Sequence, residues 1–150
     1  MSGDLTSTVQ SMRITCPPGW TDASMLIVTA GTPGASGVTP TLVVSKEAMP
    51  DDLPEERVER LTQFVDRQIE KMRASLDRFT PVSRRDATRE RMTAELRIRW
   101  ASSGIPVTQS ILFAFADDNT VITSTATAGD ADFAALEPTF RTMLQSFRNG

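Results

Sequence analysis

Apolar and polar positions alternate along much of the chain, and this alternation predicts strands. Residues 92–100 give the clearest case, because apolar side chains at every second position are separated by threonine, glutamate and arginine. A pattern of period two is typical of a strand with one buried and one solvated face. Further strands are expected over residues 8–16, 25–29, 41–45, 107–116 and 120–127. Short turns separate the later strands, which favours antiparallel pairing.

A long helix is predicted between the early and the late strands. Pro54 suits its first position, and Glu55 and Glu56 complement the positive end of the helix dipole. Apolar residues then recur at steps of three and four over about six turns, until Pro81 prevents continuation. These residues are Val58, Leu61, Val65, Ile69, Met72, Leu76 and Phe79.

A second helix is expected at the end of the chain, with an apolar stripe from Phe133 to Phe147. Asp130 or Asp132 is the expected cap. Because Pro138 lies within the stripe, we expect this helix to start near Glu137 or to bend there.

The order of elements predicts the fold class. Short strands, a long central helix, an antiparallel meander and a C-terminal helix give an α+β domain in which helices pack on an antiparallel sheet. Since no linker or internal repeat divides the chain, residues 1–150 are expected to form a single domain. Residues 30–40, rich in glycine and proline, are interpreted as a flexible surface loop without the spacing of a phosphate site.

Composition argues mainly against catalysis. The chain has no histidine, which excludes histidine-based triads and imidazole metal ligands. Cys16 is the single cysteine and is interpreted as a small core residue. We therefore predict no enzyme activity, no catalytic residue, no metal and no cofactor. The net charge of −3, together with arginines that alternate with apolar residues around Arg97 and Arg99, favours a solvated sheet face over nucleic-acid binding.

The first residues carry no recognisable targeting signal. MSGDLTSTVQSM lacks the basic start and apolar run of a signal peptide, and no uninterrupted stretch approaches the ~20 apolar residues of a spanning helix. A cytoplasmic protein without direct membrane insertion is the expectation.

Two glutamines occupy apolar positions. Gln68 lies between Val65 and Met72 on the helical stripe, and Gln109 lies between Val107 and Ile111 on the apolar face of its strand. Leaving a buried amide unpaired costs about 1–3 kcal/mol, so each needs a partner. Two interpretations stay open: the amides bond to loop backbone inside the core, or they line a partly open apolar groove and bond to a ligand.

Five segments together resemble the DcrB-related family. They are CPPGWTDASMLIV (16–28), TLVVSKEAMP (41–50), VERLTQFVDRQIEKM (58–72), the run from Gly104 to Gln109, and PTFRTMLQSFR (138–148). The resemblance covers nearly the whole chain in order and implies a PsbP-like fold. The chain is most similar to cytoplasmic members, the effector-associated Eag chaperones of type VI secretion.

That resemblance implies a function and a partner. Eag chaperones hold the N-terminal transmembrane helices of a secreted effector until the effector is loaded onto the secretion spike, and they typically act as homodimers. An open apolar groove with interspersed amides suits such a client. Carried onto this sequence, the client-binding residues are Met25, Ile27, Gln68 and Gln109, each of which has ordinary core packing as its alternative.

Two other functions compete with this one. An immunity or scaffold protein of the same fold would bind a folded soluble partner through a flatter, charged surface, for which the Arg97 and Arg99 face is the candidate. An enzyme using carboxylates and arginine ranks last, because no converging set of acid, base and nucleophile is visible.

Overall fold

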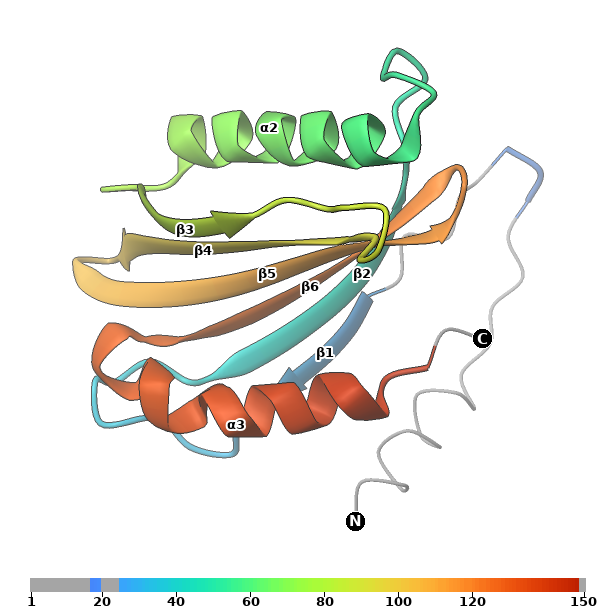
Figure 1. The fold of residues 1–150 in the computed structure, drawn as a ribbon. Coiled ribbons are helices and arrows are strands. Elements are labelled where there is room, and N and C mark those ends of the chain that lie inside the picture. Colours follow the sequence, from blue (N-terminus) through green and yellow to red (C-terminus); the bar gives the residue numbers. More distant parts are fainter. Residues whose placement is uncertain (1–16, 20–24, 149–150) are drawn as a thin grey trace.

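The computed structural model describes residues 17–19 and 25–148, and its strands form one antiparallel sheet (Figure 1). The strand order is β1-β2-β6-β5-β4-β3. The elements are β1 (Met25–Thr29), β2 (Thr41–Ala48), α2 (Arg57–Ser75), β3 (Thr80–Arg85), β4 (Thr93–Ser102), β5 (Ile105–Asp117), β6 (Thr120–Gly129) and α3 (Asp130–Ser146). The predicted α+β class with an antiparallel sheet is confirmed. The predicted strand over 8–16, with Cys16, lies outside the described residues.

The two helices pack on opposite faces of the sheet. α2 contacts β4 and β5, and α3 contacts β6 and β5. Successive residues of a strand point to opposite faces, and Ile111 and Ser110 of β5 show the division. Ile111 belongs to the core beneath α2, whereas Ser110 pairs with Ala126 of the core beneath α3. Each of the two described helices therefore covers one part of a sheet face, and neither of them covers the rest of that face.

Each helix has its own hydrophobic cluster. Under α2, Phe64 meets Phe113 edge to face, with ring centroids 6.1 Å apart, and both side chains are buried. Under α3, Phe133 and Phe140 are buried against small residues of β6 such as Ala126. The sheet residues under α2 thus include large ones such as Phe113, whereas the β6 residues under α3 are small.

Helix α2 is shorter than its apolar stripe predicts. It begins at Arg57, not Pro54, because the Glu56 carboxylate accepts the Val58 N–H at 2.6 Å and caps the first turn. It ends at Ser75, since Leu76 is extended. Leu76 and Phe79 still pack against the core, so their spacing reflects burial beyond the end of the helix.

Helix α3 is longer than predicted. It begins at Asp130, directly after β6, and runs through Pro138. Of the two alternatives, a start near Glu137 is wrong and a bend there stays a prediction. Burial of both Phe133 and Phe140 stabilises the full helix and offsets the loss of the hydrogen bond that proline cannot make. The expected aspartate cap is also wrong: Gly129 is the N-cap and makes no side-chain capping bond.

Strand β3 has no counterpart among the predicted strands. All six of its residues are exposed, and it forms the edge of the sheet beside β4. Pro81 lies in it, next to an irregularity in the register. An edge strand of this kind buries no alternating apolar face, so the periodicity that identifies the other strands is missing.

The glycine- and proline-rich loop between β1 and β2 is tied down at several points. The Ala30 N–H donates to the Pro40 carbonyl at 3.0 Å, and the Ser36 hydroxyl donates to Asp132 of α3 at 2.6 Å. Close approach requires glycine here, because a Cβ at Gly34 or Gly129 would overlap Asp132 or Ser36. The residues form a loop as predicted, but hydrogen bonds to α3 replace the flexibility that composition indicated.

Candidate functional site

The part of the α2 side of the sheet that α2 does not cover carries mainly apolar and hydroxyl side chains, and we call it the open face. Its members lie on strands β1, β2 and β6 and point to the α2 side. They are Met25, Ile27, Thr29, Thr41, Val43, Ser45, Glu47, Thr125 and Thr127. Glu47, next to Ser45 at the end of β2, is the charged residue among these members.

Strand register arranges these residues in rows that run across the sheet. In the central row Ile27 pairs with Val43, Val43 with Thr125, and Thr125 with Ile111. Residues paired in this way lie side by side on one face. Ile27 is 57% exposed at one end of the row, whereas Ile111 is 4% exposed beneath α2 at the other. The open face therefore continues directly into the core.

Met25 and Ile27 are the most exposed large apolar residues of the described chain, at 59% and 57%. Both belong to β1, which forms the sheet edge opposite β3. The structure places these two predicted site residues on the solvent-facing part of the open face, so core packing, their alternative interpretation, does not describe them.

Gln109 borders the open face from β5. It pairs with Thr127, and its Nε2 donates to the Thr127 Oγ1 at 3.0 Å. The interpretation that its amide bonds to loop backbone is therefore wrong, because the partner is a side chain of the neighbouring strand. This bond uses one amide hydrogen of a half-buried side chain, and it links Gln109 to the row of Thr127, Thr41 and Thr29.

Gln68 comes to the same side of the sheet from α2. It is half-buried and follows Leu61, Phe64 and Val65, which are the buried residues of that helix. Since α2 lies over β4 and β5, Gln68 belongs to the layer that faces Gln109. The four predicted residues thus lie on one side of the sheet, Met25 and Ile27 on the edge strand β1, Gln109 on β5 and Gln68 on α2.

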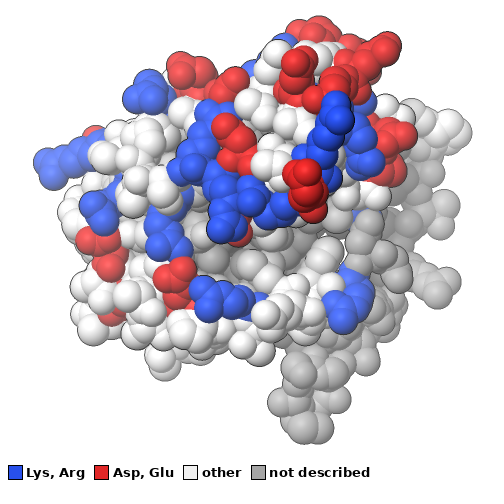
Figure 2. All heavy atoms as spheres, viewed as in Figure 1, with Lys and Arg blue, Asp and Glu red and all other residues white. Residues whose placement is uncertain are grey.

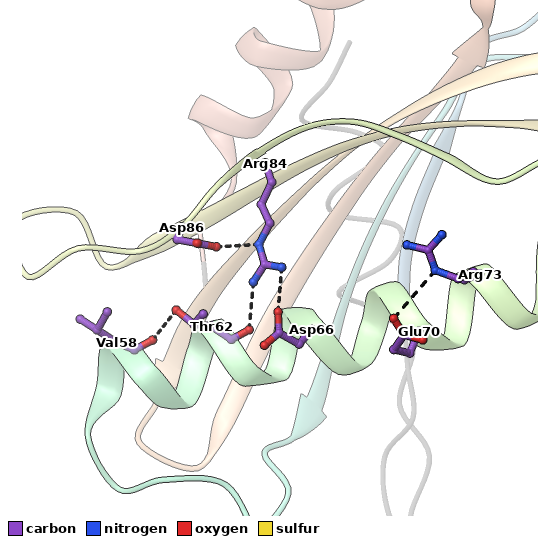
Figure 3. A network of polar contacts seen from close by, with 7 residues as sticks. All are labelled: Val58, Thr62, Asp66, Glu70, Arg73, Arg84 and Asp86. Atoms are coloured by element: carbon purple, nitrogen blue, oxygen red, sulfur yellow. Dashed lines mark hydrogen bonds and ion pairs between the residues drawn. The ribbon is translucent and has the colours of Figure 1, made fainter.

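Arg84 links β3 to the flank of α2 that lies away from the open face (Figure 3). Arg84 of β3 donates to Asp86 at 2.7 Å and to the Thr62 carbonyl at 3.2 Å, and it pairs with Asp66 at 2.7 Å. Burial lowers the pKa of Arg84, but its hydrogen bonds to Asp66 and Asp86 outweigh this effect and raise the pKa. These contacts hold α2 toward the β3 side of the sheet and away from β1 and β2.

A second ion pair ties α2 to the segment that precedes it. Arg67 donates to both carboxylate oxygens of Asp52, at 2.9 and 2.8 Å. The hydrogen bond from Arg67 lowers the pKa of Asp52. Both partners are exposed, so this bidentate pair orients the helix more than it stabilises the fold.

The threonines of β6 were not among the predicted site residues. Thr125 and Thr127 form the β6 part of the open face, while Ser124, Ala126 and Ala128 point to α3 and are buried. Thr123 points to the same side as Thr125, but its hydroxyl is buried beside Phe113. The alternation of these threonines with small residues is the sequence feature that could have identified them. A strand with hydroxyls on one face and small residues on the other packs against different surroundings on its two sides.

The Arg97 and Arg99 face is solvated in part, as the sequence indicated, with Arg99 exposed and Arg97 half-buried. Arg97 donates to Glu137 of α3 at 2.5 Å and lies over the Phe133 ring at 5.1 Å. Arg99 donates to Asp130 at 2.9 Å, and Asp130 also accepts from Thr108. The hydrogen bond from Thr108 and the one from Arg99 lower the pKa of Asp130. Helix α3 therefore covers these arginines in part.

The described part of the chain holds no cluster of three or more acidic, cysteine or histidine residues placed to bind a metal ion. Within the same residues, neither α2 nor α3 combines the length and apolar character that a membrane-spanning helix needs.

Comparison with known proteins gives the family. Residues 12–146 match the family model of DcrB. The chain belongs to the DcrB family. No curated protein matches it.

Two solved structures resemble this DcrB-family protein. PA94 of Pseudomonas aeruginosa, a protein of unknown function described as a putative regulator, has a TM-score of 0.72 and 23% identity, covering 90% of this chain and 89% of that one. LpqN of Mycobacterium tuberculosis, involved in cell envelope biogenesis, has a TM-score of 0.48 and 15% identity over 80% of each chain. At 23% identity, the likeness to PA94 shows a shared fold and nothing further.

Proposed function

We propose that this protein is a cytoplasmic chaperone or adaptor for a type VI secretion effector. It binds the N-terminal transmembrane helices of the effector on the open face, holds the effector soluble and presents it for loading onto the secretion spike. We further propose that it acts as a homodimer of PsbP-like fold and has no enzyme activity. The supporting observation is a largely uncharged sheet face that exposes Met25 and Ile27 at 59% and 57%.

The chemistry of the open face suits such a client. A transmembrane helix presents an apolar surface, which Met25, Ile27 and Val43 match. Small polar groups on that helix find partners in the hydroxyls of Thr125 and Thr127, and in the remaining amide capacity of Gln109. Charged groups would lack a counterpart on a membrane helix, and the described members of the open face include one charged residue, Glu47 at the end of β2.

The alternative, an immunity or scaffold protein, has less support. Its proposed interface relied on Arg97 and Arg99, and both guanidinium groups are engaged by Glu137 and Asp130 of α3. A partner would have to displace these contacts before it could use the arginines.

Affinity capture from the native cells, followed by mass spectrometry, tests the proposal. We expect a large protein with N-terminal transmembrane segments, and its capture should be lost when those segments are deleted. A soluble partner without such segments would contradict the chaperone function.

Changing the two glutamines separates their interpretations. For groove residues, Gln68→Ala and Gln109→Ala should weaken capture while the melting temperature barely moves. If the melting temperature falls and capture is intact, both belong to the core alone.

A further inference from the structure

The opposite side of the sheet carries a pocket of about 560 Å³, where α3 leaves β3, β4 and β5 uncovered. This volume lies within the range of small-molecule sites, roughly 300–1,000 Å³. Leu112 of β5 and Phe133 and Leu144 of α3 give it an apolar lining, and charged side chains complete the wall. Figure 2 shows basic side chains with interspersed acidic ones across this view of the molecule.

The charges of the pocket do not balance. Among the described lining residues, Arg85, Arg97 and Arg141 face two acids, Glu95 and Glu137. Arg97 makes the short contact with Glu137, to which it donates at 2.5 Å, and it lies over Phe133. The described lining residues therefore carry a net charge of one positive unit.

Two of the arginines hold only long ion pairs. Arg141 lies 3.9 Å from the Glu137 carboxylate that Arg97 already occupies, and Arg85 lies 3.6 Å from Glu95. Their side chains are 66% and 59% exposed. Because neither arginine makes a short ion pair, both keep N–H groups for an incoming anion.

We propose that this pocket binds an amphipathic carboxylate with a single negative charge. Its apolar body packs on Leu112, Phe133 and Leu144, and its carboxylate accepts hydrogen bonds from Arg141 and Arg85. Glu95 and Glu137 repel ligands with several negative charges, so nucleotides and polyphosphates are disfavoured. The site is separate from the open face, since the two lie on opposite sides of the sheet.

Calorimetric titration of the full chain with decanoate, below its micelle concentration, tests this site. We expect saturable binding of one decanoate per chain and none of decyltrimethylammonium, which has the same apolar chain and the opposite charge. Arg141→Gln should weaken decanoate binding about fivefold, as expected for loss of one charge-assisted contact. No saturable binding, or equal binding of the cation, would overturn the proposal.

A matched arginine on the other side of the sheet gives the control. Arg73 of α2 lies 3.8 Å from Glu70, as Arg141 lies 3.9 Å from Glu137, and Arg73 does not line the pocket. Arg73→Gln should leave decanoate affinity unchanged, and equal losses in Arg73→Gln and Arg141→Gln would contradict the assignment.

Ile27→Asp separates this proposal from the chaperone function. The change alters the open face alone, so decanoate binding should persist in this variant. If Ile27→Asp abolishes it, the ligand occupies the open face and the pocket assignment is wrong.

Discussion

On the α2 side, strands β1, β2 and β6 present apolar side chains and hydroxyl groups, whereas on the α3 side, strands β3 and β4 present arginines beside glutamates. Both surfaces arise in the same way, because among the described residues a single helix covers only part of each sheet face. The two surfaces differ in the residue types at alternate positions of the strands. One sheet thereby presents a largely uncharged surface on the α2 side and a charged pocket on the α3 side.

The largest expected effect comes from removing the packing that holds α2 in place. Phe64→Ala deletes a buried ring that meets Phe113, and it should lower the free energy of unfolding by about 3–5 kcal/mol. Denaturant titration measures this loss. Phe79→Ala, at the partly buried margin of the same cluster, is the control and should cost clearly less. Equal losses would mean that α2 does not depend on the Phe64 contact.

The α3 side depends on a close contact between its N-terminus and the loop before β2. Gly129→Ala would place a Cβ against the Ser36 side chain, and overpacking of this kind costs about 1–3 kcal/mol. Gly31→Ala in the same loop meets open space, so its unfolding midpoint should match that of the unchanged protein. If both variants are equally stable, the loop moves aside without cost.

Acid should destabilise the packing of α3, with a smaller effect on stability than either substitution above. Hydrogen bonds from Ser36 hold the pKa of Asp132 below its ordinary value of 3.8. The folded pKa lies below the unfolded one, so this stabilisation is present above about pH 4 and is lost as the pH falls through the folded value. Thermal unfolding from pH 6 to pH 2 should show a shallower decline for Asp132→Asn than for the unchanged protein.

Ser36→Ala provides an independent check of the same contact. It removes the hydroxyl donor to Asp132 and leaves the carboxylate in place. The melting temperature of this variant should therefore also fall less steeply as the pH is lowered. An unaltered pH profile in both variants would show that the Ser36–Asp132 contact does not contribute to acid sensitivity.

The sequence predicts those elements whose apolar pattern reflects their own burial. β4 and α2 are examples, because alternation around Ile98 and the stripe around Val65 describe side chains that are fully buried. β3 escapes prediction because all its residues are exposed. The start of α3 escapes because its packing on Ala126 and Ala128, which lie on a strand, outweighs the local effect of Pro138.

The sequence predicts which strand face the candidate site residues share, but not how exposed these residues are or what they contact. Met25 and Ile27 are in phase on one strand, so their common face follows from period two. Their exposure does not follow, because it depends on where α2 lies, and α2 is held by the long-range contacts of Arg84 with Asp66. The hydroxyl partner of Gln109 is equally hidden, since Thr127 becomes its neighbour only through strand pairing.

The most direct test of the central claim compares two exposed apolar residues. Ile27 lies on the open face and Val82 on β3, and both side chains are exposed, at 57% and 45%. Ile27→Asp and Val82→Asp should each shift stability by no more than about 0.5 kcal/mol. Quantitative capture from cells should then measure how much effector with N-terminal transmembrane segments each variant binds. Ile27→Asp should reduce the captured amount at least about tenfold, because binding would bury the new charge against the client. Val82→Asp should capture as much effector as the unchanged protein. Equal capture by both variants would contradict the assignment of the open face as the client-binding surface.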